Sequence, residues 1–436
     1  MTTSKDCQPG SQQDLIRRRA QLLGPELSLS YENPLHLVRG EDVWLYDADG
    51  RAYLDAYNNV AHVGHCHADV VAAIARQAAR LNTNTRYLHE TVLDLSEFLT
   101  AKLPSGLDVC FFVNSGSEAN DIAWQMAKAF SGNTGVLVLD EAYHGISEAT
   151  FAMSPSEYDA ANQPGHVETL ESPDSYRGRL RGNSPEVGIG YTESCDQSLA
   201  ALAQRGHAPA ALIIDSGTSS SGILDLPEGY LPAITKNVQA AGGLYIADEV
   251  QVGLGRSGSH FWGFEALGAK PDIVTIGKPI GNGHPIGIVV TSREILAKFN
   301  AHVPFFSTFG GNPVSAAAGL EVLKVIDRQN LQQNARETSA YLKQGVKDLA
   351  EREILIGDVR GSGLLIGIDL VLDRETREPA GKSANQIFNH MRNNGVLIGT
   401  AGPHGNVLKI RPPMTFSKTH AEQLITTLAD ALNAIR

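Results

Sequence analysis

Four short motifs in this 436-residue chain place chemically useful side chains directly after apolar runs. The first is NSGSE at residues 114–118, which follows VCFFV and opens a helical pattern. Hydroxyls and free backbone N–H groups at a helix N-terminus form a site for a phosphate group. An ordinary helix N-cap uses the same residue types and is the commoner outcome. Ser115, Gly116 and Ser117 are therefore candidate phosphate ligands.

Asp248 and Lys278 supply the next two groups. Asp248 ends the apolar run LYIAD, and a carboxylate there can hold a protonated heterocyclic nitrogen, although many such carboxylates only cap loops. Lys278 lies in TIGKPIGNG, after DIVTI. Packing of a lysine stem among apolar and glycine-rich backbone lowers the pKa of its ammonium and favours imine formation. The alternative is a surface lysine in a turn.

Tyr143, in AYHG just past VLVLDE, offers an aromatic face for a flat ring. Pyridoxal 5'-phosphate (PLP) requires four groups: a phosphate-binding site, an aromatic side chain against its ring, a carboxylate for its ring nitrogen and a lysine for its aldehyde. Ligands of open α/β sheets bind beyond the carboxyl ends of the strands, where all four motifs fall. Each motif is weak alone, but their order and shared location predict a PLP site.

The elements that must position these groups form an alternating pattern from about residue 65 onward. Apolar runs without polar alternation predict strands buried on both faces, and the stretches between them have helical periodicity. The pattern predicts an α/β fold with a mainly parallel sheet flanked by helices. The expected strands lie near 109–113, 135–139, 211–215, 244–248 and 272–276, and the clearest helices at 70–81, 117–130 and 231–242.

The two ends of the chain do not follow this alternation of strands and helices. Residues 1–60 are interpreted as an arm and a hairpin turning at DADG, part of a smaller α+β domain. Residues 61–315 form the predicted large PLP-binding domain, within which 154–184 is expected to be an irregular excursion. Residues 316–436 complete the small domain, with a long helix-periodic stretch over 316–351, strands near 363–372 and a final helix.

The composition of the chain argues against some classes of binding partner and indicates the cellular compartment. The formal net charge of −12 argues against general nucleic-acid or anionic-membrane binding, and 42% hydrophobic with 19% charged residues is typical of a globular protein. Apolar runs stay short of a membrane span, and the N-terminus lacks the apolar core of a signal peptide. Four scattered cysteines, Cys7, Cys66, Cys110 and Cys195, fit a reduced, cytoplasmic protein.

Three histidines close in sequence, His62, His65 and His67, suggest a metal site. Their spacing places them in a turn before a helix, and neither a cysteine pair nor an HExxH motif accompanies them. We therefore expect no metal cofactor.

The whole chain resembles the class III PLP-dependent aminotransferases of the fold type I superfamily. The likeness rests on NSGSEAND, DEVQVGLGRSG, TIGKPIGNGHPIG and STFGGNPVSAAAG, which occur here in the order of that family. The resemblance implies that Lys278 forms a Schiff base with PLP and that Asp248 pairs with its pyridinium nitrogen. It also implies that the triplet 115–117 holds the cofactor phosphate.

The same resemblance assigns four further residues. Tyr143 and Val250 would cover opposite faces of the PLP ring, and Gln251 would lie near the ring hydroxyl. Thr308, in FFSTFGGN, would reach the cofactor phosphate of a partner subunit. This implies an obligate homodimer with shared active sites, and the sequence does not decide whether dimers pair into tetramers.

One stretch narrows the resemblance. Residues 57–90, YNNVAHVGHCHADVVAAIARQAARLNTNTRYLHE, are similar to the ethanolamine-phosphate and phosphohydroxylysine phospho-lyases, a branch that does not transaminate. Two departures from the aminotransferase pattern agree: Asp215-Ser216 replaces the usual Glu-Pro, and Lys409 in VLKIRPP replaces an arginine that clamps a carboxylate. A lysine serves phosphate as a point charge. The candidates for the substrate phosphate are Asn58, Asn59, Lys409 and Arg411, although Arg411 is equally suited to a structural role.

The resulting hypothesis is a phospho-lyase that converts O-phosphoethanolamine, or a similar vicinal amino phosphate, to acetaldehyde, ammonia and phosphate. A class III ω-aminotransferase would share the cofactor site but would require a keto acid. A non-catalytic binding or scaffold protein would not depend on Lys278 at all.

Overall fold

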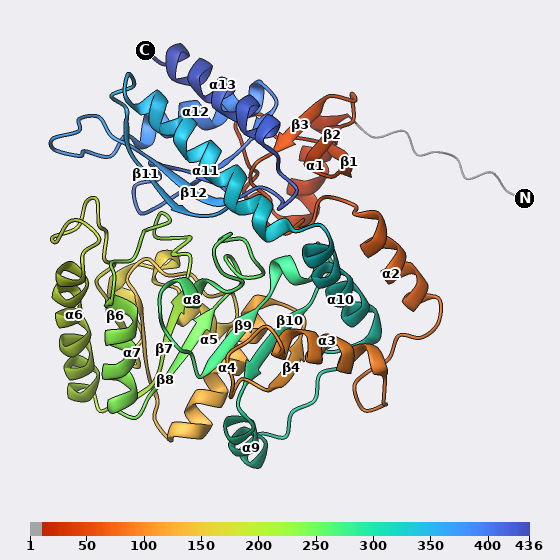
Figure 1. The fold of residues 1–436 in the computed structure, drawn as a ribbon, viewed down its shortest axis with the longest axis vertical. Helices are drawn as coiled ribbons and strands as arrows, with labels where there is room; N and C mark the ends of the chain where they lie inside the picture. The colour runs from red at the N-terminus through yellow and green to blue at the C-terminus, as the bar shows by residue number, and fades with distance from the viewer. Residues whose placement is uncertain (1–10) are drawn as a thin grey trace, which may run out of the picture.

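The computed structural model describes residues 11–436, so Cys7 and the first ten residues of the predicted arm lie outside the described part. Figure 1 shows a large sheet wrapped by helices, with two smaller sheets and the C-terminal helices stacked against one side of it. Within residues 11–436, no helix combines the length and the apolar character needed to cross a membrane.

The large sheet has seven strands and confirms the predicted α/β class. Only β10 runs antiparallel to its neighbours, while the pairs from β9 to β6 are parallel. The order is β4 (Val109–Val113), β10 (Gly287–Thr291), β9 (Ile273–Ile276), β8 (Leu244–Asp248), β7 (Pro209–Asp215), β5 (Gly135–Leu139) and β6 (Val167–Leu170).

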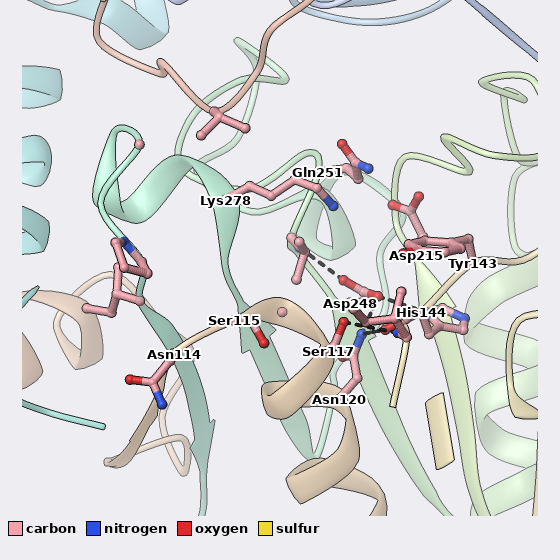
Figure 2. Close-up of a pocket in the computed structure, with 18 of the residues that line it drawn as sticks. Asn114, Ser115, Ser117, Asn120, Tyr143, His144, Asp215, Asp248, Gln251 and Lys278 are labelled. Carbon is pink, nitrogen blue, oxygen red and sulfur yellow. Dashed lines mark hydrogen bonds and ion pairs between the residues drawn. The ribbon is translucent and has the colours of Figure 1, made fainter. Parts of the chain in front are cut away.

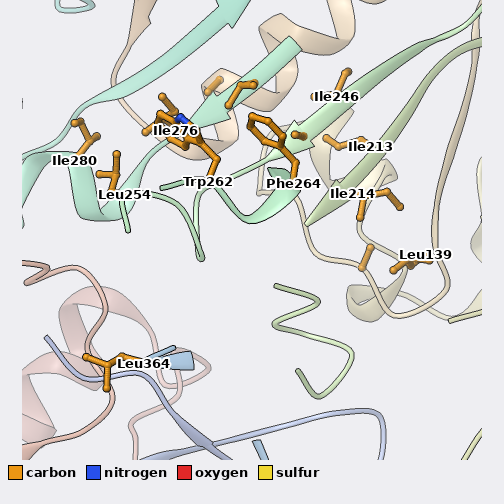
Figure 3. Packing of buried hydrophobic residues seen from close by; sticks show 14 of the residues in the cluster. Leu139, Ile213, Ile214, Ile246, Leu254, Trp262, Phe264, Ile276, Ile280 and Leu364 are labelled. Carbon is orange, nitrogen blue, oxygen red and sulfur yellow. The ribbon is translucent and has the colours of Figure 1, made fainter. Parts of the chain in front are cut away.

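The central strands are buried on both faces, as their uninterrupted apolar runs predict. Figure 3 shows Ile213, Ile246 and Ile276 from three strands near the aromatic rings of Trp262 and Phe264. Helices cover the sheet in Figure 1, with α4 (Gly116–Ser131) packed on β7, β9 and β10. This packing fixes the strand ends that carry the predicted site.

Two four-stranded sheets lie outside the large one. The predicted hairpin around residues 47–50 is confirmed, because β2 (Trp44–Asp47) pairs with β3 (Ala52–Asp55). β3 also pairs in parallel with β13 (Val396–Leu397), so the N-terminal hairpin and the C-terminal segment share a sheet that includes β1 (Leu37–Glu41). The other sheet has the order β11 (Ile356–Ser362), β12 (Leu365–Leu370), β15 (Val407–Ile410) and β14 (Gly399–Ala401).

Two sequence-based expectations need correction. The helix-periodic stretch 316–351 is two helices, α10 (Pro313–Arg328) and α11 (Leu331–Ala350), because Asn330 adopts a left-handed φ of 51° that ends the run. The excursion at 154–184 is not wholly irregular, since it contains β6, an edge strand of the large sheet. Its four residues are too few to give a clear strand pattern.

The remaining helices lie around these sheets. They are α1 (Gln12–Leu23), α2 (Ala68–Ala78), α3 (Glu90–Thr100), α4 (Gly116–Ser131), α5 (Glu148–Ala152), α6 (Pro185–Gln204), α7 (Tyr230–Ala240), α8 (Gly263–Ala266), α9 (Arg293–His302), α12 (Gly381–Asn393) and α13 (Lys418–Ala434), with short 3₁₀ turns η1 (Pro155–Glu157), η2 (Ala160–Asn162) and η3 (Lys278–Gly281).

Candidate active site

A cavity of about 300 Å³ lies at the carboxyl edge of the large sheet. Its walls come from the ends of β7 and β8, the start of α4, the turn after β5 and the segment from η3 to β10. Eight of the residues predicted to bind or react with a cofactor line it: Ser115, Gly116, Ser117, Tyr143, Asp248, Val250, Gln251 and Lys278. Figure 2 shows Ser115, Ser117, Tyr143, Asp248, Gln251 and Lys278 around one space.

The first turn of α4 forms one end of the cavity. Ser115 is the N-cap, and its Oγ accepts a hydrogen bond from Glu118 N at 3.1 Å. Ser117 Oγ accepts one from Ile146 N at 3.2 Å. Because each hydroxyl oxygen is an acceptor in these bonds, its proton can turn toward an anion. The hydroxyls and the helix N-terminus together fit a phosphate group.

Two glycines allow α4 to approach its neighbours closely. A Cβ on Gly116 would lie 3.0 Å from both methyl groups of Val250. A Cβ on Gly277 would lie 3.1 Å from the backbone of Gly116. Any side chain at either position would push the helix start away from Val250 and from the peptide that precedes Lys278.

Asp248 is the buried carboxylate of the cavity, with 3% of its surface exposed. Its Oδ2 lies 2.8 Å from both Asn120 Nδ2 and His144 Nδ1, and its Oδ1 accepts a hydrogen bond from Val250 N at 3.1 Å. Across residues 11–436, no lysine or arginine forms an ion pair with it. A carboxylate oriented in this way and left without a permanent cation fits a protonated ring nitrogen.

Asn120 and His144 also belong to the site, although no motif predicted a role for either. Asn120 connects two strand ends, because its amide donates to Asp248 while its Oδ1 accepts a 2.6 Å hydrogen bond from Thr275 Oγ1. His144 is 2% exposed and follows Tyr143 directly. Both residues stand inside motifs already identified as functional, NSGSEAND and AYHG, and that position is the signal that could have found them.

Lys278 begins η3 with a left-handed φ of 30°. Figure 2 shows its side chain extended across the cavity, with the ammonium between Gln251 and Asp248. Burial lowers the pKa of Lys278, and the positive charge of Arg411 lowers it further, while Asp248 opposes the shift. The neutral amine needed for imine formation is therefore favoured relative to an exposed lysine.

Asp215 is a second carboxylate in the cavity wall and was noted from sequence only as a departure from the family pattern. It pairs with Asp248 in the register of β7 and β8. Burial raises the pKa of Asp215, and the negative charge of Asp248 adds to this effect. Its two oxygens accept hydrogen bonds from Gly217 N at 2.9 Å and Ser219 N at 2.8 Å.

The four residues predicted for a substrate phosphate do not line the cavity directly. Asn59 Nδ2 and Arg411 Nη1 both donate to Gln251 Oε1, at 2.6 Å and 2.7 Å. Gln251 therefore separates them from the cavity. Lys409 Nζ donates to Ser219 O at 2.6 Å, whereas Asn58 contributes only a backbone N–H to Asp55 at 2.9 Å.

The cations of this group are buried and crowded. Burial lowers the pKa of Lys409 to about 7, and the nearby charges of Arg411 and Lys278 contribute. Burial likewise lowers the pKa of Arg256 to about 9, with Arg411 again adding to the shift. The buried positive charge of Lys409 and Arg411 favours an anion close to them.

Thr308 lies in the exposed loop between α9 and α10 and does not line the cavity. Its predicted contact is with the cofactor of a second subunit, and the structure describes a single chain.

The three neighbouring histidines have separate environments. His62 is fully buried, with Nε2 2.9 Å from Leu254 O, and burial lowers its pKa to about 3. His65 Nε2 lies 2.6 Å from Asp55 Oδ2, and His67 is the N-cap residue of α2. Among residues 11–436, no group of three or more His, Cys, Asp or Glu side chains is arranged to hold a metal ion.

The residues of the cavity fit PLP. The start of α4 suits its phosphate, the buried Asp248 suits its ring nitrogen, and Tyr143 and Val250 line the same space. Lys278 points into the same space with a lowered pKa, as a lysine that reacts with an aldehyde requires.

Comparison with known proteins agrees with this geometry. The family model described as aminotransferase class-III matches residues 28–432. An alanine–glyoxylate aminotransferase 2-like protein of Drosophila melanogaster is 42% identical over 98% of this chain and 88% of its own length. An ethanolamine-phosphate phospho-lyase homologue of Caenorhabditis elegans is 36% identical over 97% of this chain and 94% of its own length.

Among solved structures, a phospholyase from Arthrobacter in complex with phosphoethanolamine superposes with a TM-score of 0.93. It is 42% identical to this protein, and the match covers 97% of this chain and 100% of that chain. The family match spans both the large sheet that carries the cavity and the smaller sheets around it. The chain therefore belongs to the class III aminotransferase family and is a PLP-dependent enzyme.

Proposed function

We propose that this enzyme is a phospho-lyase that eliminates phosphate from O-phosphoethanolamine, or from a similar vicinal amino phosphate, to give acetaldehyde, ammonia and inorganic phosphate. The observation that carries the proposal is the 42% identity, over 97% of the chain, to a solved phospholyase that holds phosphoethanolamine. Lys409 supplies the chemical reason, because an ammonium serves phosphate as a point charge but cannot give a carboxylate the two-pronged grip of a guanidinium.

Bound PLP supplies an aldehyde that condenses with the substrate amine and a ring that delocalises the charge left when the neighbouring carbon loses a proton. Asp248 holds the proton on the ring nitrogen, and the fixed hydrogen bonds from Asn120 and His144 keep its carboxylate in place. Lys278, once free, takes the proton from the amine-bearing carbon, which its lowered pKa permits.

The other end of the substrate decides between elimination and transamination. The C–O bond to phosphate breaks with its electron pair on the departing oxygen, so positive charge beside that oxygen lowers the barrier. Lys409 and Arg411 are the cations that we assign to this task, and Gln251 Oε1 accepts one hydrogen bond from Arg411 and another from Asn59. Water then converts the two-carbon remainder to acetaldehyde and ammonia.

A second candidate is an aminotransferase that moves an amino group to a keto acid. It is favoured by the relative named alanine–glyoxylate aminotransferase 2-like, which is as similar in sequence as the phospholyase. Such an enzyme would use the same PLP site. It would need a site for a carboxylate where this chain has Lys409.

The deciding experiment incubates the PLP-loaded enzyme with O-phosphoethanolamine in the absence of a keto acid. Phosphate and acetaldehyde are measured together over many turnovers. We expect sustained release of both in equal amounts. A single conversion of the cofactor to its amine form, with turnover restored only by a keto acid, would instead establish the aminotransferase.

We also propose that the enzyme is a homodimer with shared active sites. The loop that carries Thr308 exposes Phe306 and Phe309, and the neighbouring segment exposes Tyr87 and Leu88. Apolar side chains gathered in this way are typical of a protein interface. Sedimentation velocity of the PLP-loaded enzyme tests the dimer, and a monomer at all concentrations would contradict it.

A further inference from the structure

The turn after β7 connects the cavity wall to Lys409. Asp215 accepts hydrogen bonds from Gly217 N at 2.9 Å and from Ser219 N at 2.8 Å. Ser219 in turn presents its carbonyl oxygen to Lys409 Nζ at 2.6 Å. One carboxylate therefore binds the N–H group of the same residue whose carbonyl oxygen holds the lysine.

This turn has little freedom to rearrange. The hydroxyl of Thr218 exchanges two hydrogen bonds with the backbone of Leu224, at 2.7 Å and 3.0 Å, and Thr218 itself has a left-handed φ of 43°. A Cβ on Gly217 would lie 2.7 Å from Leu365, so the turn is tightly packed from outside. The direction of the Ser219 carbonyl is thus set by the fold and not by the lysine.

The charge of Lys409 is incompletely compensated. The side chain is 7% exposed, and within the part of the chain that the structure describes its ammonium has no carboxylate partner at ion-pair distance. The charged groups that face it are Arg411 on its own strand, Lys278 on η3 and Asp215 on β7. Asp215 is close enough to favour the ammonium through space, but both of its oxygens are bound to the turn.

A buried cation without a partner is costly, and an anion that reaches it completes the pair. The lowered pKa of Lys409, about 7, agrees with this incomplete compensation. The second and third N–H groups of the ammonium remain available for oxygen acceptors, since the bond to Ser219 O uses one.

We propose that Asp215 is a positioning residue that selects for a dianionic substrate: by binding the N–H groups of its own turn it keeps the ammonium of Lys409 unpaired and directed by the Ser219 carbonyl. The inference rests on the proposed phospho-lyase function and adds to it the residue that controls the charge of the phosphate site. A glutamate at this position has one more methylene and fits the turn less well. It would instead pair with Lys409, and the neutral pair would no longer attract a dianion.

The test measures sulfate binding to the PLP-loaded enzyme by isothermal titration calorimetry at several pH values. Sulfate is a suitable probe because it stays a dianion throughout the titration of Lys409. Asp215→Glu is expected to weaken sulfate binding about tenfold, because it neutralises one charged hydrogen-bond donor. It is also expected to move the pH at which binding is lost upward, because a direct carboxylate partner raises the pKa of the lysine.

Asp215→Asn is expected to move the same pH limit downward, because it removes the negative charge that now favours the ammonium. Opposite pH shifts in the two variants would not arise from a general loss of structure. Asp140→Glu is the matched control: Asp140 follows β5, is bound by Ser172 and has no role toward Lys409, so its lengthening should leave sulfate binding unchanged.

A double-mutant comparison then tests whether Asp215 acts through the lysine. In a Lys409→Met background, Asp215→Glu should weaken sulfate binding no further. An equal loss in both backgrounds would overturn the proposal, as would wild-type affinity and pH dependence in both Asp215 variants. If Asp215→Glu does not fold, as judged by circular dichroism, the downward shift in Asp215→Asn decides the question alone.

The same enzyme preparation separates this inference from the proposed function. Suppose that the two Asp215 variants shift sulfate binding as expected but that the enzyme releases no phosphate from O-phosphoethanolamine. The role of Asp215 would then stand, and the phospho-lyase function would be refuted. If the enzyme releases phosphate but neither Asp215 variant changes sulfate binding, the phospho-lyase function would stand and the role of Asp215 would be refuted.

Discussion

The two ends of the cavity are built in different ways. At the cofactor end, Ser115, Ser117, Asp248 and Lys278 line the space directly and follow strands of one sheet. At the substrate end, the cations come from outside that sheet. Lys409 belongs to β15 of a smaller sheet, and Arg411 follows the same strand and reaches the cavity wall only through Gln251.

We infer from this difference that the cofactor end is rigid and carries the chemistry, whereas the substrate end is adjustable and selects the substrate. The strands of the large sheet are hydrogen-bonded to each other, so the groups at their ends keep fixed relative positions. The substrate end depends on contacts between the large sheet and a smaller one, such as the bond from Lys409 to Ser219. Substitutions at the cofactor end should therefore abolish the reaction, whereas those at the substrate end should change which molecule is accepted.

The largest effect is expected from Lys278→Ala. Loss of the group that binds the cofactor aldehyde and moves the substrate proton should lower the rate of phosphate release about a thousandfold or more. After borohydride reduction, mass spectrometry should show a PLP adduct in the wild type and none in the variant. Replacement of the exposed Lys270 by alanine is the control and should change neither reading. A fully active Lys278→Ala enzyme would show that the cofactor end does not carry the chemistry through this lysine.

Asp248→Asn is expected to have the next largest effect. An amide cannot keep the proton on the ring nitrogen, so the rate of phosphate release should fall about a hundredfold, while the variant still binds PLP. The absorbance spectrum reports cofactor binding, and a phosphate assay reports the rate. A rate within twofold of wild type would show that the cofactor end does not depend on this carboxylate.

Lys409→Met should act on substrate binding more than on turnover. Loss of a charged hydrogen-bond donor should raise KM for O-phosphoethanolamine about tenfold or more. Because the lowered pKa of Lys409 is about 7, its ammonium is complete below that pH and is lost above it. The wild type should therefore bind the substrate less well as pH rises through this range, and the variant should lose that dependence.

Steady-state kinetics at several pH values separate these effects, and the exposed Lys418→Met serves as the control. If Lys409→Met lowered kcat as strongly as Lys278→Ala and left KM unchanged, the distinction between the two ends would fail.

The smallest effect is expected from Thr308→Ala. Loss of the proposed hydroxyl contact to the cofactor phosphate of the partner subunit should weaken PLP binding about threefold to tenfold. Equilibrium dialysis measures the affinity, and sedimentation velocity checks that the oligomeric state is unchanged. Unaltered affinity would mean that the cofactor end is complete within one chain.

The cofactor end could be predicted from sequence because each of its motifs is local. NSGSE, LYIAD and TIGK each place a functional residue at the boundary between a strand and the next element, and these boundaries are visible as changes in hydrophobic pattern. Asn120 and His144 were missed because their roles are bonds to Asp248, more than 100 residues away in the chain. No local pattern reports such a partner.

The substrate end shows the limit of this approach. The sequence indicated Lys409 and Arg411 through their residue types beside the Pro-Pro pair, but not that Gln251 separates Arg411 from the cavity. Asn58 was grouped with Asn59 by adjacency, yet only the side chain of Asn59 reaches Gln251. Both residues lie in the irregular segment after β3, where no periodic pattern tells from sequence which side chain faces the site.

The sequence by itself determined the α/β class and the PLP dependence, and it predicted the residues that carry the chemistry, because hydrophobic periodicity and strand-end motifs are local properties. Only the tertiary structure decided that the Ser219 carbonyl meets Lys409 and that Arg411 donates to Gln251. These contacts join β7, β8 and β15, which belong to two different sheets. Their geometry follows from how the sheets pack, and packing depends on all the buried side chains at once.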